Sequence, residues 1–153
     1  HQSLESAPLA GVLPAICSVL PSMPLSDIQI RSLSPSALAY IGDAVYELYV
    51  RTHYLLPPRR SHTYHHLVVA QVRAEKQAQH LQKLEPHLTD GELQVLRRGR
   101  NAALRKSKRV DATVYQQASS FETLVGYLYL ADSKRLLQLL AHLNLGLASE
   151  RFP

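Results

Sequence analysis

Residues 38–50 read LAYIGDAVYELYV, an almost wholly apolar stretch that carries a Gly-Asp pair near its middle. Ser34 and Pro35 precede it, and they are a helix-start signal because serine caps a free backbone N–H and proline suits the first helical position. A pair of prolines follows shortly after the stretch. The pattern predicts one long helix that runs from Ser34 to about Leu55.

This predicted helix is apolar on more than one side. At the helical step of about 100° per residue, one stripe and much of the opposite side are both apolar. The stripe holds Leu38, Ile41, Val45 and Leu48, and the opposite side holds Ala39, Tyr40, Tyr46 and Val50. A helix that is apolar on nearly all sides is typical of a buried helix, so we expect this one to lie in the core.

Asp43 points away from the leucine stripe into the second apolar side, and Gly42 beside it allows another backbone to approach closely. A buried carboxylate without partners costs several kcal/mol, so it requires a metal ion, a base or hydrogen-bond donors. The alternative is an aspartate at a helix-packing seam, satisfied by an arginine or by backbone N–H groups. Glu47 on the same helix is either a second ligand or a surface residue, and the surface position is favoured.

The rest of the chain also reads as helix. Residues 63–84 carry apolar side chains mostly at a 3.6-residue spacing, which predicts one amphipathic helix. Further helices are expected from the capping box of Thr89 and Glu92 to near Gly99, from near Asp111 through SSFETLVGYLYL, and over KRLLQLLAHL after a cap at Asp132 or Ser133. No alternating β pattern is present. The predicted fold class is therefore all-α, a helical bundle.

The composition indicates one domain with a conventional core. The chain has 153 residues and one cysteine, Cys17, which excludes an intramolecular disulfide and fits a reducing compartment. No apolar run is long enough to span a membrane. The apolar N-terminal piece is interrupted by prolines and lacks a basic leader, so a signal peptide is not expected. The chain begins with His1, which leaves a removed transit peptide open.

Positive charge is concentrated in residues 97–109, RRGRNAALRKSKR. This segment holds seven of the 17 basic residues and no acidic residue, whereas the whole chain carries a net charge of +5. Read as a loop with turns at Gly99 and Asn101, it is expected to bind a phosphate backbone. The alternative is a solvated loop without a partner. Because no aromatic residue is interleaved, duplex recognition is favoured over stacking on single strands.

Glu122 is the second acid that the sequence singles out. On a helix it shares a face with Ser119, Gly126 and Tyr129, and Gly126 again leaves room for another helix. Two such helices can cross so that Asp43 and Glu122 converge on one Mg²⁺ ion, which needs only one or two carboxylates in addition to water and phosphate oxygens. The structural alternative ties Glu122 to an arginine such as Arg73 or Arg100.

These motifs resemble a known enzyme family. LAYIGDAVYELYVR resembles the signature helix of the ribonuclease III family, and YQQASSFETLVGYLYL resembles its second catalytic helix. The strings RRGRNA and VVAQVRAEKQAQHL are similar to those of Mini-III, the minimal branch that consists of the ribonuclease III domain alone. Three positions where the family generally has acids hold Ser36, Ala39 and Ser119 here, as is common in the Mini-III branch.

The resemblance implies a homodimeric, Mg²⁺-dependent endonuclease for double-stranded RNA, with Mn²⁺ as a possible substitute and with Asp43 and Glu122 as catalytic metal ligands. It implies 5′-phosphate and 3′-hydroxyl products, ribosomal RNA precursors as substrates, and a cytoplasmic location, or an organelle stroma after removal of a transit peptide. The expected domains are an extension over residues 1–32, the catalytic domain over 33–145 and a tail over 146–153. The expected RNA contacts are Arg97, Arg98, Arg100, Asn101, Arg105, Lys106, Lys108 and Arg109.

Two alternatives remain at this stage. A catalytically inert helical module would bind duplex RNA without cutting it, although the retained acids count against this. A zinc protein could use His62, His65 and His66, whose i, i+3, i+4 spacing places their rings on one helix face, but no cysteine stands nearby to complete the usual four ligands.

Overall fold

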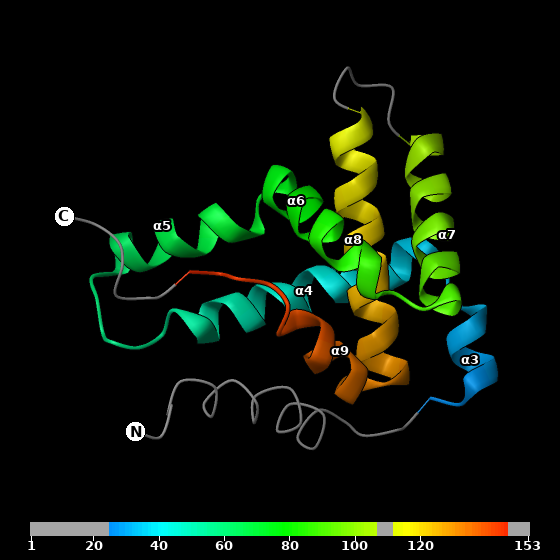
Figure 1. Ribbon diagram of the computed structural model, residues 1–153, viewed down its shortest axis with the longest axis horizontal. Helices are drawn as coiled ribbons and strands as arrows, with labels where there is room; N and C mark the ends of the chain where they lie inside the picture. The colour runs from blue at the N-terminus through cyan, green and yellow to red at the C-terminus, as the bar shows by residue number, and fades with distance from the viewer. Residues whose placement is uncertain (1–24, 107–111, 147–153) are drawn as a thin grey trace.

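The computed structural model describes residues 25–106 and 112–146 of the chain. Within these ranges the secondary structure is helical and contains no strand, so the predicted all-α class is confirmed (Figure 1). The elements are α3 (Asp27–Ser32), α4 (Pro35–His53), α5 (Ser61–Val72), α6 (Ala74–Leu84), the 3₁₀ helix η1 (Glu85–His87), α7 (Asp90–Lys106), α8 (Ala112–Ala131) and α9 (Ser133–Leu140).

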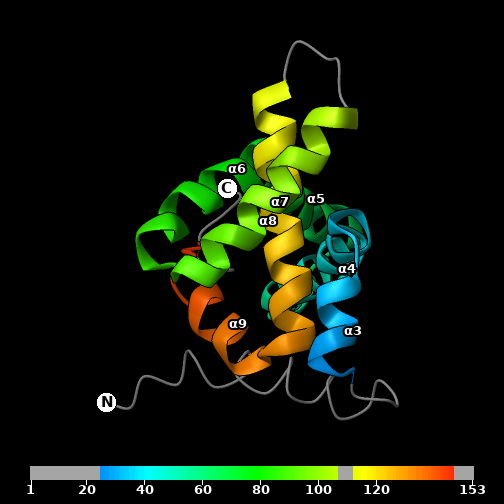
Figure 2. The same cartoon turned by 90° about the vertical axis from the view of Figure 1, so that its right-hand side faces the viewer.

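The central helix is α8. It packs against α3, α4, α6, α7 and α9, and buried side chains occur on several of its sides. α7 runs beside α8 in Figure 1 and lies in front of it, inclined to it, in Figure 2, whereas α4 crosses α8 in Figure 1. Apolar side chains from these helices form one core, which includes Tyr46, Leu81, Phe121, Leu124 and Leu136.

The backbones of α4 and α8 come into contact where the two helices cross, because each contributes a glycine there. A Cβ added to Gly42 would overlap the carbonyl oxygen of Glu122 and would lie 2.8 Å from the backbone nitrogen of Gly126. A Cβ added to Gly126 would overlap the carbonyl oxygen of Leu38. The close approach predicted at both glycines is therefore confirmed.

Three predicted helix caps are present. The Ser34 side chain caps the first turn of α4. At the start of α7, Thr89 Oγ1 accepts a bond from the backbone N–H of Glu92 at 3.2 Å, and Glu92 Oε1 accepts one from the backbone N–H of Thr89 at 2.9 Å. Asp132 caps α9 by accepting from the backbone N–H of Arg135 at 3.1 Å. These contacts depend on residues close in sequence, which is why the sequence predicts them.

The expectation that α4 is buried on nearly all sides is wrong for the single chain. Leu38 and Val45 are buried, but Ile41 and Leu48 from the same predicted stripe are 38% and 40% exposed, and Tyr40 is 83% exposed. The neighbouring helices cover only one side of α4, and the opposite side remains at the surface. We call this surface the free face of α4; its exposed apolar residues are Ala37, Tyr40, Ile41, Ala44 and Leu48, and the exposed Arg51 shares it near the end of the helix.

Two helix boundaries also differ from the prediction. The single helix expected over residues 63–84 is two helices, which meet at Arg73, whose backbone is extended with φ −64° and ψ 154°. The helix expected to end near Gly99 continues to Lys106. Gly99 is a packing glycine instead of a stop signal, because a Cβ there would lie 2.7 Å from Thr123 Oγ1 on α8.

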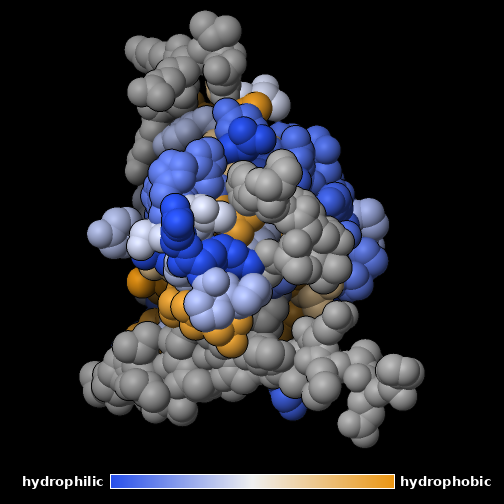
Figure 3. All heavy atoms as spheres, turned by 90° about the vertical axis from the view of Figure 1, so that its left-hand side faces the viewer, coloured by the Kyte–Doolittle hydropathy of each residue, from blue (hydrophilic) through white to orange (hydrophobic). Residues whose placement is uncertain are grey.

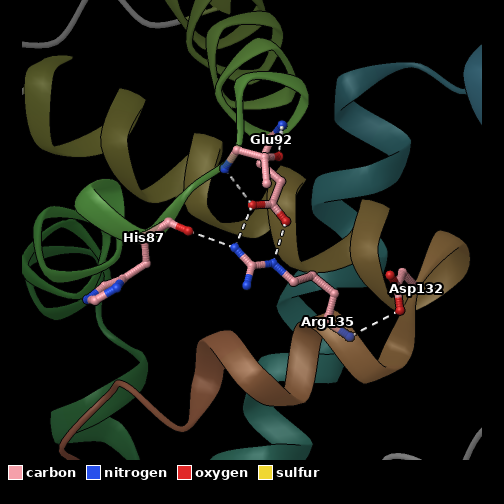
Figure 4. A network of polar contacts seen from close by, with 5 residues as sticks. His87, Glu92, Asp132 and Arg135 are labelled. Carbon is pink, nitrogen blue, oxygen red and sulfur yellow. Dashed lines mark hydrogen bonds and ion pairs between the residues drawn. The ribbon is translucent and has the colours of Figure 1, made fainter.

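Arg135 links α9 to the start of α7 through a salt bridge with Glu92 (Figure 4). Its Nε donates to Glu92 Oε2 at 2.9 Å, and one terminal nitrogen donates both to Glu92 Oε1 at 3.0 Å and to the carbonyl oxygen of His87 at 2.7 Å. Glu92 is buried, and the hydrogen bond from Arg135 is the largest cause of its lowered pKa. The Glu92 carboxylate thus takes part both in the capping box of α7 and in a bidentate ion pair with Arg135.

The chain before α4 also contributes to the packed structure. α3 lies in the segment predicted as an extension, and it rests on α8 with Ile30 buried. The domain boundaries after residues 32 and 145 remain predictions. None of the helices in the described ranges is both long and apolar enough to cross a membrane.

We predict that Gly42→Ala and Gly126→Ala each destabilise the protein by about 1–3 kcal/mol or more, because each added methyl forces the two backbones apart. Gly91→Ala is the matched control, since the nearest atom to a Cβ there is Thr89 Oγ1 at 4.0 Å. Urea denaturation of the three variants measures the difference. Wild-type stability in the first two would show that α4 and α8 are not held together at this contact.

Candidate active site

Asp43 and Glu122 line one pocket between α4, α7 and α8. The pocket has a volume of about 260 Å³ and is open to solvent. Its other lining residues are Pro35, Ser36, Ala39, Tyr40, Gly99, Ala102, Ala103, Tyr115, Ser119 and Thr123. The structure thus brings together the two carboxylates that the sequence singled out. The backbone contact at Gly42 and Gly126 places them there, since each acid is within four residues of one of these glycines.

Glu122 is the more enclosed of the two acids. The pKa of its carboxyl is raised to about 7; burial is the largest cause, the charge of the nearby Asp43 adds to the rise, and a hydrogen bond with the Gln77 side chain opposes it. Within the described residues Glu122 forms no ion pair with Arg73 or Arg100, so the structural alternative for this acid is not supported. A carboxylate that is partly desolvated and repelled by a neighbour favours a proton or a cation.

Asp43 lies at the edge of the pocket. The expectation of a deeply buried carboxylate is wrong, because Asp43 is exposed in the single chain. On α4 it stands between the side that packs on α8 and the free face, so only part of its surface is covered. Partial burial is still the largest cause of its raised pKa, followed by the charge of Glu47. Glu47 itself pairs with Arg51 at 2.9 Å on the surface, as the favoured interpretation predicted.

The donor set of this pocket fits a hard divalent cation. Two carboxylates with raised pKa values supply oxygen ligands whose mutual repulsion a cation would relieve. No group of three or more His, Cys, Asp or Glu side chains suited to a metal occurs in the described part of the chain. A closed zinc site is therefore not supported, whereas Mg²⁺ requires only one or two carboxylates besides water and phosphate oxygens.

The histidines of the zinc alternative lie elsewhere, on α5. The rings of His62 and His66 are 5.2 Å apart with an interplanar angle of 59°, and all three histidines, including His65, are exposed. They do not face the pocket of Asp43 and Glu122, which α5 does not line. This arrangement is that of surface side chains on one helix face.

The basic segment is a helix where the structure describes it. Arg97, Arg98, Arg100, Asn101 and Arg105 are exposed residues of α7, and Lys106 is its last residue. The predicted turns at Gly99 and Asn101 are wrong, since both positions are helical. Lys108 and Arg109 lie outside the described residues. Arg98 also donates to the carbonyl oxygen of Leu33 at 3.3 Å, which ties α7 to the chain before α4.

Some residues of the site were not foreseen. Gln77 on α6 lowers the pKa of Glu122 through a side-chain hydrogen bond, and Tyr40 and Tyr115 line the pocket. Gln77 carries no local signal, because its position depends on the break at Arg73, which neither glycine nor proline marks. The tyrosines belong to helices that were predicted, but their place at the pocket depends on how those helices cross.

Comparisons with known proteins point to one family. The family model described as the Ribonuclease III domain matches residues 36–133. Mini-ribonuclease 3 from Synechocystis sp. is 59% identical over 122 residues, which cover 80% of this chain and 85% of that protein. Mini-ribonuclease 3 from Staphylococcus aureus is 36% identical, covering 82% and 96%. The crystal structure of protein FN1578 from Fusobacterium nucleatum has the same fold, with a TM-score of 0.66 at 24% identity over 76% of this chain and 95% of that one.

We predict that the metal-free protein loses stability relative to its Glu122→Gln variant as the pH rises. The folded-state pKa of about 7 lies above the ordinary value of 4.5, so this carboxyl lowers the stability of the wild-type protein progressively as the pH rises from 4.5 to 7, where the unfolded chain has released the proton and the folded protein has not. Relative to its value well below pH 4.5, the difference should approach about 3 kcal/mol at pH 8, and about 2 kcal/mol of this change falls between pH 5.5 and pH 8. Urea denaturation of both proteins in a chelator at pH 5.5 and pH 8 measures it. A difference that does not change with pH would contradict the burial of this carboxyl.

Proposed function

The chain belongs to the ribonuclease III family, and we propose that it is an endoribonuclease of double-stranded RNA whose reaction centre is the pocket of Asp43 and Glu122. The observation that carries the assignment of the centre is the convergence of these two acids from different helices on one open pocket. An inert RNA-binding module would have no need to hold two carboxylates with raised pKa values side by side.

The family depends in general on divalent metal, and we infer Mg²⁺ at this site, with Mn²⁺ as a substitute. Asp43 and Glu122 would hold the ion. When bound, it supplies Lewis-acid activation of a water molecule and neutralises charge on the scissile phosphate, which leaves 5′-phosphate and 3′-hydroxyl ends. Asp43 is exposed, so it would lie close to the backbone of the bound RNA. Glu122 is more enclosed and would hold the metal ion from the inner side of the pocket.

The solvent-facing side of α7 would bind the RNA duplex. Arg97, Arg100 and Arg105 project from this side, and the flank of the same helix lines the pocket through Gly99 and Ala102. Arg100 and Arg105 stand about 60° around the helix from the nearest pocket-lining position, so phosphates bound by them would lie closer to the two acids than phosphates bound by Arg97. Such contacts are electrostatic and carry no sequence information by themselves.

The free face of α4 supports a homodimer. A small protein rarely leaves a row of apolar side chains on one helix in water, and a face that pairs with its own copy is the usual reason. The apolar surface continues into the turn after α4, where Leu55 and Leu56 are 53% and 66% exposed. Figure 3 views this end of the molecule and shows hydrophobic surface, in orange, next to hydrophilic surface, in blue.

The resemblance to Mini-III leads us to infer ribosomal RNA precursors as substrates. We infer a cytoplasmic location, or an organelle stroma if a transit peptide is removed from a longer precursor. Cleavage assays on duplex stems taken from ribosomal RNA precursors, compared with unrelated duplexes of equal length, would test the substrate.

We predict that Asp43→Asn and Glu122→Gln each abolish Mg²⁺-dependent cleavage of a long RNA duplex and leave folding and duplex binding largely intact. Each change removes a ligand charge and keeps the side-chain volume nearly constant. Gel analysis with end-group determination measures cleavage, and filter binding measures affinity. Wild-type turnover in both variants would refute the assignment of the site.

A matched variant separates binding from catalysis. Arg97→Gln, Arg100→Gln and Arg105→Gln combined should weaken duplex binding and flatten its salt dependence, by about 0.9 in the slope of log K against log salt per lost phosphate contact, taking the B-DNA value as a guide. The remaining cleavage should give the same end groups. Arg98 is left unchanged because it also bonds to the carbonyl of Leu33. An unchanged slope would place the duplex elsewhere on the protein.

We predict that the wild-type protein sediments as a dimer at micromolar concentration and that Ile41→Lys combined with Leu48→Lys yields a folded monomer. Both side chains are exposed in the single chain, so a charge there disturbs association without entering the core. Leu104→Lys on α7 is the control, because Leu104 is 52% exposed away from the free face of α4. A wild-type monomer that cleaves duplex RNA would exclude the dimer.

A further inference from the structure

We propose that Tyr115 is a substrate-positioning residue whose phenolic hydroxyl donates a hydrogen bond to the sugar-phosphate backbone of the scissile RNA strand, a few nucleotides from the cleaved bond. This inference rests on the proposed function, because it takes the pocket of Asp43 and Glu122 as the reaction centre. Tyr115 lines this pocket together with the two acids and is 41% exposed. Its side chain therefore borders the cavity that the RNA strand must enter.

The spacing along α8 sets how far Tyr115 lies from the reacting phosphate. Tyr115, Ser119 and Glu122 follow one another at i, i+4 and i+7, so they share one side of the helix. Seven residues of α-helix rise about 10.5 Å. This length corresponds to about three nucleotides, taking the rise of about 3.4 Å per nucleotide in a DNA strand as a guide. A strand that runs along this side of α8 from Glu122 therefore reaches Tyr115 within about three nucleotides of the cut.

The hydroxyl of Tyr115 is available for such a bond. Elsewhere in the chain, tyrosine hydroxyls join separate helices: Tyr46 Oη donates to the carbonyl oxygen of Gln71 at 3.3 Å, and Tyr64 Oη donates to that of Arg51 at 2.6 Å. Tyr115 Oη forms no hydrogen bond with any residue in the described ranges. A phenylalanine would therefore pack there equally well, and the hydroxyl is left to donate to a molecule that enters the pocket.

Two other hydroxyl side chains of the pocket are less suited to this role. Tyr40 belongs to the free face of α4, which the proposed dimer would cover. Thr123 Oγ1 donates to a backbone carbonyl of its own helix at 2.7 Å, so its hydrogen is already used. Tyr115 has neither restriction. Ala102 of α7 lines the same pocket, so the Tyr115 side chain also borders the helix that carries the proposed RNA-binding arginines.

The contact would fix the position of the strand along the pocket. A phosphate oxygen and a ribose 2′-hydroxyl oxygen can each accept from a phenol, and both occur in every nucleotide, so the contact carries no base preference. The arginines of α7 attract the duplex without setting its register, because their interaction is mainly electrostatic. A directed hydrogen bond near the cut instead holds the scissile phosphate opposite the two acids, which favours the reaction step.

The test uses a synthetic RNA duplex that the wild-type protein cuts at one mapped bond. Tyr115→Phe removes only the hydroxyl and should lower the cleavage rate at saturating RNA by about 10-fold, because one hydrogen bond to the substrate is lost. The melting temperature and the Mg²⁺ concentration for half-maximal cleavage should not change. Tyr127→Phe is the matched control, since Tyr127 is on the same helix but lines a separate pocket with Arg135. It should cleave like the wild type.

Modified duplexes separate positioning from a structural role. Single 2′-deoxy or methylphosphonate nucleotides are placed in turn at the positions within about three nucleotides of the cut. At the contacted nucleotide, the modification should slow the wild type by about 10-fold and have no further effect on Tyr115→Phe, because both changes remove the same bond. An effect of the 2′-deoxy nucleotide assigns the contact to the ribose, and an effect of the methylphosphonate assigns it to the phosphate. Tyr127→Phe should respond to each modification as the wild type does.

The outcomes separate this inference from the proposed function. Equal cleavage rates of the wild type and Tyr115→Phe would overturn the role of Tyr115, as would effects of variant and modification that multiply at every position tested. Either result leaves the reaction centre in place if Asp43→Asn still abolishes cleavage. Wild-type cleavage by Asp43→Asn and Glu122→Gln would overturn the reaction centre itself, and the role of Tyr115 with it.

Discussion

The backbone contact between α4 and α8 is the constraint on which the site depends. Gly42 and Gly126 let the two helices approach so closely that a Cβ at either position would overlap a carbonyl oxygen of the other helix. The carbonyl that meets Gly42 belongs to Glu122, and Asp43 is the residue after Gly42. The contact between α4 and α8 therefore also fixes the backbone positions of Asp43 and Glu122. Neither backbone can shift without separating these two helices.

The same region holds two ionisable groups, an acid and a base, whose pKa values are shifted in opposite directions by burial, which disfavours the charged form of both. Burial raises the pKa of Glu122 to about 7 and lowers the pKa of His80 on α6 to about 4, so both groups favour their neutral forms without a metal. His80 is fully buried, makes no hydrogen bond through either ring nitrogen, and packs edge-on against Tyr46 and beside Phe121. A neutral histidine suits this apolar position, whereas a cation beside Glu122 would favour its carboxylate form.

The sequence predicts features that depend on residues close together in the chain. The caps at Ser34, Asp132 and the Thr89–Glu92 box are contacts within one turn, and both glycines of the crossing stand beside or near the acids that they position. The break at Arg73 could not be predicted, because it is stabilised by Gln77 and by neighbouring helices without a glycine or proline. Gly99 was misread as a helix end for a related reason: a glycine that allows close packing and a glycine that stops a helix look alike in sequence.

The continuous α7 changes what the basic segment can do. In a loop, the arginines would sample many arrangements, and each phosphate contact would have to overcome the entropy of ordering the loop. On a helix that packs along α8, Arg97, Arg100 and Arg105 have a fixed spacing on one side, while Gly99 and Ala102 of the same helix line the pocket. A phosphate backbone held by this helix is thereby held at a fixed position relative to Asp43 and Glu122. Under the proposed function, binding along α7 would contribute to catalysis through orientation as well as through affinity.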